Sequence, residues 1–358
     1  MRYFGAVILL HACHSLAPLP DETPANCAES SSLASQLLAL NSTFESASLD
    51  VFNLACLSKP RRHVVVASGD SALRKLGEWA VILNRGFESN LQILEDDFSA
   101  GVQIALPGCG PHDALLLSET QQILVSCYAA AELRLVDLSG REQRRISLSA
   151  FADADGIPEA DQLLRIEDRI WVSLQRLSAD AEPVNTSLLI ALDAHSLEVL
   201  GEPIELALKN PFTPMQSTNG LILIGCAGDF VSPSLMGLVQ VNLETRHSSV
   251  VVDGRALARA PLALRVNALG EPHLLIAHPD GFNTQQMRLV RVDQGFVETR
   301  HSSQGFTLSG LAFEAEGNAF LGNRSLDQQA GLWKISAQGE VSGPYKTGLP
   351  PLELEVLE

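Results

Sequence analysis

Positive charge is scarce in this sequence. Its 358 residues include 25 Lys and Arg against 42 Asp and Glu, which gives a formal net charge of −17. A chain of this charge repels phosphates, so the basic footprint of a nucleic-acid-binding protein is excluded. The acidic residues are spread along the chain, and we interpret them first as a solubilising surface and second as an attraction for cations.

Long apolar stretches and regular helical patterns are also lacking. No stretch reaches the ~18–20 apolar residues that a membrane-spanning helix needs. Apolar residues do not recur with a sustained helical period, and the best helix candidate is Glu29 to Leu40. Hydrophobic residues nevertheless make up 46% of the chain and charged residues 19%. This mix supports a sizeable core and argues against global disorder.

The common catalytic patterns are missing as well. The chain has no Ser-His-Asp order of the known hydrolases, no Gly-x-Ser-x-Gly elbow and no His-x-x-x-His pair. Its cysteines do not fall in a Cys-x-x-Cys or comparable zinc spacing. These absences favour a binding protein over an enzyme.

The N-terminus has the pattern of an export signal. Arg2 is a short basic region, and Phe4 to Leu10 is a short apolar region. The following Leu10 to Cys13 resembles the bacterial lipobox, in which the cysteine becomes the lipidated first residue of the mature protein. We therefore predict a signal peptide over residues 1–13 with Cys13 as the lipidation site. Secretion without a lipid, or an apolar N-terminus without a signal function, are the alternatives.

The segment after Cys13 is rich in Pro, Ser and acidic residues. Such a composition is typical of a flexible tether, which we place at residues 14–36. The predicted location is the bacterial cell envelope, with the protein anchored in the membrane by its lipid and facing the periplasm or the cell surface.

Export would place the remaining five cysteines in an oxidising compartment. Because five is odd, at least one is free or pairs between chains. Cys109 and Cys127 flank a predicted pair of strands, and Cys27 with Cys56 could pin the N-terminal arm. The partner of Cys226 is left open.

One strand pattern recurs along the chain. Two or three apolar residues precede a polar residue, in most copies Asp or Asn, that is followed by a turn, and these polar ends are separated by steps of 43, 41, 56, 49, 51 and 43 residues. A period of about 40–50 residues is that of a four-stranded propeller blade. The seven copies are Leu49 to Asn53, Leu91 to Asp96, Leu133 to Asp137, Leu189 to Asp193, Leu238 to Asn242, Leu289 to Asp293 and Leu332 to Ser336. We predict an all-β protein with a single propeller of about seven four-stranded blades over residues 37–358.

The first repeat lacks its innermost strand. The C-terminal stretch Leu352 to Leu357 alternates apolar and acidic residues with period two, as a strand does. Either this stretch or the N-terminal arm near Leu37 to Leu40 is expected to close the ring, because closure removes exposed sheet edges.

Several stretches resemble a known family. Gly110 to Ala114 before a strand, followed by Leu133 to Gly140, is similar to the YVTN-type β-propeller proteins of bacterial cell surfaces. Ala152 to Asp161, followed by Leu174 to Leu177, resembles more closely a group of bacterial propeller lipoproteins. The resemblance covers roughly residues 45–340 and implies the fold, but it implies no activity. The YVTN signature itself is absent, and Ile123 to Ser126 stands in its place.

The densest carboxylate cluster consists of Asp153, Asp155, Glu159 and Asp161. Calcium prefers several oxygen ligands from one tight loop with a glycine at the turn, and Asp-Ala-Asp-Gly supplies these. The fit to the EF-hand pattern is partial. The alternative is an acidic, solvated turn whose Asp side chains bond their own backbone.

A second candidate site lies where the inner strands begin. His112 and Asp113 are placed at the start of one inner strand, and Glu159 and Asp161 occupy the equivalent place in the next repeat. Such groups could form a ring that binds a ligand or metal in the central channel, or they could merely cap strand ends. Three arginines at the ends of second strands could line one mouth of the channel: Arg85, Arg176 and Arg324.

The first functional hypothesis is a binding or scaffold module at the cell envelope that recognises a protein, a peptide or a small molecule. The second is a metal-dependent, lactonase-like hydrolase with His112, Asp113 and Glu159 in the channel. A third is a repeat protein stabilised by calcium. Convergence of the candidate side chains on the channel would favour the hydrolase over the other two.

Overall fold

The computed structural model describes residues 35–43, 45–67, 70–86, 89–277, 286–325 and 329–357. These residues belong to one compact unit, Leu33–Glu358, and a second unit, Met1–Ser32, lies outside the described residues. The predicted signal peptide, Cys13 and most of the predicted tether therefore lie outside them too.

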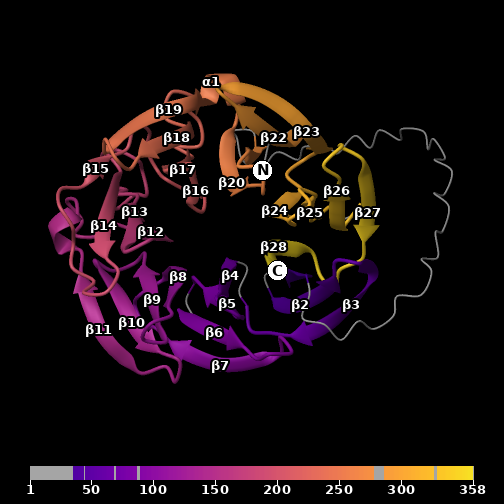
Figure 1. The fold of residues 1–358 in the computed structure, drawn as a ribbon, viewed down its shortest axis with the longest axis horizontal. Coiled ribbons are helices and arrows are strands. Elements are labelled where there is room, and N and C mark those ends of the chain that lie inside the picture. The colour runs from indigo at the N-terminus through magenta and orange to yellow at the C-terminus, as the bar shows by residue number, and fades with distance from the viewer. Residues whose placement is uncertain are drawn as a thin grey trace, which may run out of the picture. The chain divides into compact units, whose positions relative to one another are not determined.

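Within the described unit, seven antiparallel sheets of four strands each are arranged in a ring, as Figure 1 shows. This is a seven-bladed β-propeller, which confirms the predicted fold class and blade number. Blade 1 contains β28, β1, β2 and β3, and blades 2 to 7 contain β4–β7, β8–β11, β12–β15, β16–β19, β20–β23 and β24–β27.

Each blade has an inner, a second, a third and an outer strand. The inner strands are β28 (Pro351–Leu357), β4 (Ser71–Leu76), β8 (Pro111–Leu117), β12 (Ala160–Ile166), β16 (Gln216–Thr218), β20 (Ala260–Val266) and β24 (Leu308–Phe313). The second strands are β1 (Gln36–Thr43), β5 (Trp79–Asn84), β9 (Gln122–Cys127), β13 (Arg169–Leu174), β17 (Leu221–Cys226), β21 (Pro272–Ala277) and β25 (Ala319–Asn323).

The third strands are β2 (Ser46–Asn53), β6 (Asn90–Leu94), β10 (Glu132–Asp137), β14 (Leu188–Asp193), β18 (Gly237–Asn242), β22 (Gln286–Asp293) and β26 (Gly331–Ile335). The outer strands are β3 (Cys56–Val64), β7 (Ala100–Ala105), β11 (Glu142–Ser147), β15 (Ile204–Glu205), β19 (His247–Asp253), β23 (Phe296–Gln304) and β27 (Val341–Tyr345). Two short helical turns, η1 (Ser149–Phe151) and α1 (Gly254–Leu257), complete the described elements. Among the described residues, no helix has the length and apolar character needed to cross a membrane.

The recurring strand of the sequence is the third strand of every blade. Its polar end has a local cause. The side chains of Asp137, Asp193 and Asn242 each accept hydrogen bonds from two backbone N–H groups that follow them. This Asx-type turn starts the hairpin to the outer strand, and it explains why Asp or Asn recurs at this position.

The core lies between the blades rather than within them. Seven clusters of buried apolar residues each join two neighbouring blades. In β1, Leu37 and Ala39 pack toward blade 7, whereas Leu38 and Leu40 pack toward blade 2. Because both faces of such a strand are buried, successive residues are apolar and its sequence is a continuous apolar run.

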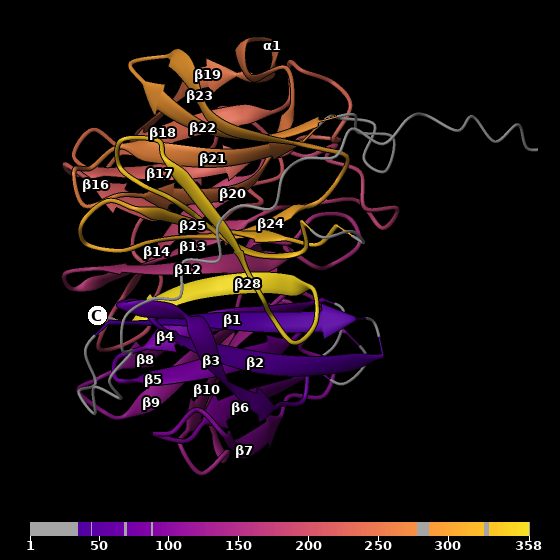
Figure 2. The same ribbon diagram turned by 90° about the vertical axis from the view of Figure 1, so that its right-hand side faces the viewer.

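Closure of the ring combines the two predicted segments. β28 pairs with β1 in antiparallel register and supplies the inner strand that the first repeat lacks, and Figure 2 shows the two strands side by side. The expected helix over Glu29 to Leu40 is wrong for its described part, because Gln36 to Leu40 belong to β1. Burial of two faces requires an extended strand here, which the weak helical pattern did not reveal.

The cysteines follow the predicted pattern in part. Cys109 and Cys127 form a disulfide with a Cα–Cα distance of 4.4 Å. Cys226 is free and buried. This agrees with the expectation that at least one of the five cysteines after Cys13 does not pair within the chain. Cys56 is disulfide-bonded, and the predicted partner Cys27 lies outside the described residues.

Candidate functional site

Two cavities lie along the central channel. The first, which we call the His112 chamber, has a volume of about 350 Å³ and includes His112, Tyr128, Asp161, Gln175, Phe212 and Phe230 in its wall. The second, the Arg265 chamber, has a volume of about 410 Å³ and includes Lys75, Asp113, Leu115, Leu164, Arg265 and Glu355. Arg74 and Pro214 line both chambers. Side chains therefore narrow the channel but leave two cavities within it.

Strand direction explains which residues meet in the His112 chamber. His112 and Asp161 stand at the beginnings of the inner strands β8 and β12, whereas Tyr128 and Gln175 follow the ends of the second strands β9 and β13. Because neighbouring strands are antiparallel, the beginning of one and the end of the next meet at the same edge of the blade. Two neighbouring blades thus place these four side chains together.

A hydrogen-bond network fixes the polar wall of this chamber. The Nδ1 atom of His112 lies 3.0 Å from Oδ1 of Asp161. The same carboxylate accepts hydrogen bonds from Nε2 of Gln162 at 2.6 Å and from Nε2 of Gln175 at 2.8 Å. Asp161 is 2% exposed, so its charge is held almost entirely by these donors.

Tyr128 extends the network. Its ring stacks on the His112 imidazole with a centroid distance of 3.9 Å. Its hydroxyl donates to Oε1 of Gln175 at 2.8 Å. Burial raises the pKa of the Tyr128 hydroxyl well above its usual range, and the neighbouring charges of Asp161 and Glu159 raise it further. The hydroxyl is therefore a hydrogen-bond donor at any physiological pH.

Another part of the wall of the His112 chamber is apolar. Phe212 and Phe230 meet edge to face with ring centroids 5.3 Å apart, and Leu177 and Leu262 line the same space. Phe212 is 39% exposed, although a large aromatic side chain gains most when it is covered. A ligand with an apolar ring could cover it.

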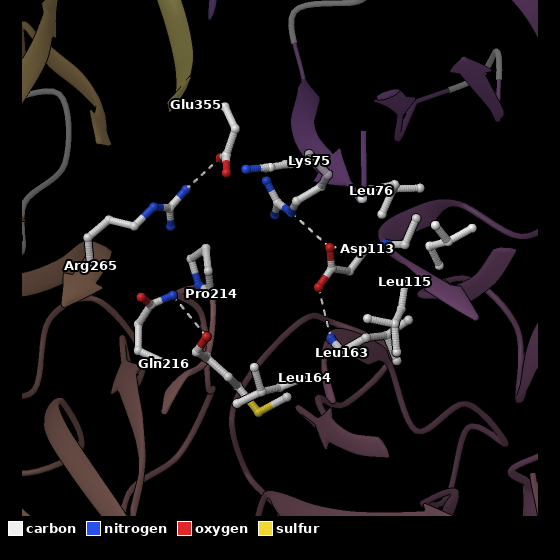
Figure 3. Close-up of a pocket in the computed structure, with 15 residues that line it drawn as sticks. Lys75, Leu76, Asp113, Leu115, Leu163, Leu164, Pro214, Gln216, Arg265 and Glu355 are labelled. Carbon is white, nitrogen blue, oxygen red and sulfur yellow. Dashed lines mark hydrogen bonds and ion pairs between the residues drawn. The ribbon is translucent and has the colours of Figure 1, made fainter. Parts of the chain in front are cut away.

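Figure 3 shows the Arg265 chamber, whose wall combines five charged side chains with a larger number of apolar ones. Nε of Arg74 donates to Oδ1 of Asp113 at 2.8 Å, and Arg265 lies 3.5 Å from Glu355. Burial raises the pKa of Glu355 despite the neighbouring cations Arg265 and Arg74. Both Arg74 and Arg265 are already paired with carboxylates, and the residues described in the wall of this chamber include no aromatic side chain. It is therefore a weaker candidate for a charged, flat ligand than the His112 chamber.

The structure separates the predicted channel residues. His112 and Asp161 line one chamber, whereas Asp113 lines the other and is held by Arg74 and by the backbone N–H of Leu163 at 2.8 Å. Glu159 is not among the residues that line either chamber. Its Oε2 accepts the backbone N–H of Leu177 at 2.9 Å.

Glu159 is nevertheless chemically unusual. Burial raises the pKa of its carboxyl to about 8, with further contributions from the charges of Asp155 and Asp153. Its backbone is left-handed, with φ of 44°, at the point where the acidic turn enters β12. The structure therefore brings Glu159 close to the acidic turn rather than to the channel.

Asp153 and Asp155 lie in that acidic turn. Burial and the carboxyl of Asp155 raise the pKa of Asp153, and the Asn185 amide donates to Asp153. Asp155 is exposed and accepts the backbone N–H of Ile157. Over the described ranges, no group of three or more His, Cys, Asp or Glu side chains has an arrangement that could hold a metal ion. The calcium site at Asp153, Asp155, Glu159 and Asp161 stays a prediction.

The three arginines predicted at the channel mouth have different surroundings. Arg85 lines the His112 chamber, and its Nη2 donates to the carbonyl oxygen of His112 at 3.3 Å. Arg176 donates to the carbonyl of Thr186, and Arg324 to the carbonyl of Ser42. Only Arg85 among the three is found in the wall of a chamber.

Sequence reasoning missed the aromatic wall, although a signal for it was present. Two of the three longest steps of the repeat, 56 and 49 residues, end at Asp193 and Asn242. They contain the loops 175–187 and 227–236, which carry Leu177 and Phe230. Inserted loops at one end of a propeller are a frequent place for binding residues.

Comparisons with known proteins support the propeller fold and do not identify a function. No protein-family model and no curated protein matches this chain. A functionally unknown protein from Desulfotomaculum acetoxidans DSM 771 is similar, with a TM-score of 0.58, 11% identity and coverage of 89% of this chain and 98% of that one. Apo AztD from Citrobacter koseri has a TM-score of 0.53 and 8% identity, over 90% and 98% of the two chains. Virginiamycin B lyase from Staphylococcus aureus has a TM-score of 0.55 and 8% identity, over 77% and 84%.

At such low identities, these likenesses show the fold alone. They agree with the propeller that the sequence resemblance implied. The finer assignment to the YVTN-type lipoproteins stays a prediction.

Proposed function

We propose that this protein is an exported propeller of the cell envelope that binds a small molecule in the His112 chamber. The observation that supports this proposal is the pairing of a fixed polar wall with a partly uncovered aromatic wall in one cavity of about 350 Å³. Small-molecule sites combine mostly apolar surface with a few fixed polar groups in cavities of about 300–1,000 Å³.

The wall specifies the chemistry of the ligand. Phe212 and Phe230 suit an aromatic or other flat apolar ring. Arg85 suits a carboxylate or another oxygen acceptor, because guanidinium groups are strong donors to such oxygens. Arg74 lines the same chamber, but its guanidinium is already paired with Asp113. A flat ring that bears a carboxylate is therefore the simplest match.

The test is ligand-observed NMR with benzoate, benzamide and benzyl alcohol as probes. We expect saturable binding, strongest for benzoate, which is lost in Phe212→Ala and in His112→Ala. His195→Ala is the matched control, since His195 is an exposed histidine on another loop. Absence of saturable binding, or binding that survives both chamber substitutions, would overturn the proposal.

The export part of the proposal rests on the N-terminal pattern and is supported by the buried disulfide between Cys109 and Cys127. Disulfides of this kind persist mainly in oxidising compartments. Metabolic labelling with an alkyne fatty acid tests the anchor at Cys13. We expect wild-type protein to be labelled in the membrane fraction and Cys13→Ser to be unlabelled and soluble. Label that persists in Cys13→Ser would contradict the lipid anchor.

A further inference from the structure

We propose that the His112 chamber is also a catalytic site, in which Nε2 of His112 activates a water molecule for hydrolysis of a carboxylic ester. This inference rests on the chamber of the proposed function and assigns it a reaction.

The hydrogen bonds around Asp161 determine which nitrogen of His112 carries the proton. An ionised carboxylate only accepts, and Asp161 meets donors from Gln162 and Gln175 as well as the imidazole. Nδ1 of His112 is therefore the protonated nitrogen of the neutral ring. The lone pair is on Nε2, which has no hydrogen-bond partner from the described part of the chain. A carboxylate that orients histidine in this way is the arrangement of a general base.

The ring is also held in position. Tyr128 covers one face of the imidazole, and its hydroxyl reaches back to Asp161 through Gln175. Arg85 bonds the backbone carbonyl of His112 from another blade. A base whose orientation is locked by its surroundings loses less entropy when it reacts, which favours catalysis over a merely structural ion pair.

A guanidinium group completes the site. Both Arg74 and Arg85 line the same chamber as His112. Arg74 is paired with Asp113 at 2.8 Å, so Arg85 is the guanidinium that can donate to an oxygen that becomes negative. Such donors stabilise the oxyanion of acyl transfer most strongly in a site that excludes water.

The step balances without any further reactant. Water loses a proton to Nε2 of His112 while its oxygen forms a bond to the ester carbon, and the carbonyl electrons move to the oxygen near Arg85. When the carbonyl reforms, the bond to the leaving alkoxide breaks and the alkoxide takes the proton from Nε2. The products are a carboxylic acid and an alcohol, and the imidazole is regenerated.

The test measures hydrolysis of 4-nitrophenyl benzoate and 4-nitrophenyl acetate. General base catalysis contributes about 10²–10⁴-fold, so His112→Ala should lower kcat/KM at least about 100-fold. His195→Ala is the matched control, because His195 also lies near an aspartate, Asp168 at 3.6 Å, but on the exposed surface. Its kcat/KM should stay close to that of the wild type.

Asp161 is a positioning residue in this scheme, so its variant needs a second readout. Asp161→Asn should lower kcat and also displace the pH profile, because the amide no longer holds the proton on Nδ1. Loss of stability alone would leave the pH profile of the remaining activity unchanged.

A measurement on the wild-type protein avoids any variant that fails to fold. Iodoacetate should alkylate His112 faster than His195, although the side chain of His112 is 18% exposed and that of His195 is 63% exposed. Absence of ester turnover, turnover unchanged in His112→Ala, or slower alkylation of His112 than of His195 would each overturn the proposal. Benzoate binding that persists in these cases would leave the proposed binding function intact.

Discussion

At the scale of single residues, the carboxyl of Glu159 has a pKa far above its ordinary value. It is buried, it accepts one backbone hydrogen bond, and two further carboxylates lie nearby. Its folded-state pKa of about 8 exceeds the ordinary value of 4.5. The folded protein therefore retains a proton that the unfolded chain releases.

This difference predicts how stability depends on pH. The contribution of Glu159 is fully present below about pH 4.5 and is lost as the pH rises toward 8, because the folded state binds more protons over this range. The free energy of unfolding, measured with urea, should fall by at least about 1 kcal/mol between these limits. Glu159→Gln should remove that part of the decline, whereas Glu182→Gln on an exposed loop should keep it. An unchanged slope in Glu159→Gln would contradict the prediction.

If the acidic turn binds calcium, ionisation of the same carboxyls should stabilise the folded state rather than destabilise it. A bound cation would favour the ionised carboxyls of Asp153, Asp155 and Glu159 and would stabilise the folded state by mass action. Excess calcium at pH 8 should then raise the melting temperature of the wild type, and Asp155→Asn should abolish the rise. A melting temperature unaffected by calcium or by a chelator would exclude the calcium site.

At the scale of elements, the disulfide of blade 3 supports the His112 chamber. Cys109 precedes β8 and lies three positions before His112, and Cys127 ends β9 and adjoins Tyr128. The bond therefore holds together the two strand ends whose side chains stack.

Removal of this disulfide should weaken both the fold and the site. The bridge spans 18 residues, and a closed loop of this size contributes about 3 kcal/mol in the chain-entropy account. We expect Cys109→Ala/Cys127→Ala to lower the free energy of unfolding by about 2–4 kcal/mol and to weaken benzoate binding. Cys226→Ala, which removes a free buried thiol, should cost about 1 kcal/mol or less. Unaltered stability of the double variant would refute the role given to the bridge.

At the scale of the whole described unit, the ring depends on one strand from the far end of the chain. β28 completes blade 1, and Leu354 within it is buried against blade 7. Glu353 and Glu355 of the same strand face the channel, where both lie near Arg74. The strand thus joins the first and last blades and contributes charge to both chambers.

A chain that ends at residue 350 should lose cooperative unfolding and should aggregate, because an unpaired β1 would expose a sheet edge. Thermal unfolding followed by circular dichroism, together with light scattering, checks this. Addition of a peptide of residues 351–358 should restore a cooperative transition by strand addition. The control Glu353→Gln/Glu355→Gln keeps the strand and should remain folded. A truncated chain that melts like the wild type would show that β28 is dispensable.

Local features of the sequence predicted the fold well. Polar residues at the ends of third strands, such as Asp137 and Asp193, bond the backbone of their own turns. Their positions therefore depend on a few neighbouring residues, and a periodic spacing of such residues reveals the blades. The disulfide between Cys109 and Cys127 could be predicted for a similar reason, because the two cysteines flank one pair of strands that are neighbours in the sequence.

The sites depended on contacts that no local pattern contains. Adjacent residues His112 and Asp113 line different chambers. The strand register shifts between Pro111 and Ala114, and each of the two side chains meets a different partner. Asp161 reaches His112 from 49 positions away, and Glu353 approaches Arg74 only when the ring is closed. The sequence by itself thus determined an all-β propeller and its blades, since these follow from short-range periodicity, and it left two segments as candidates for closing the ring. Only the tertiary structure decided which polar groups converge, because convergence depends on how seven blades place the ends of their strands around one axis.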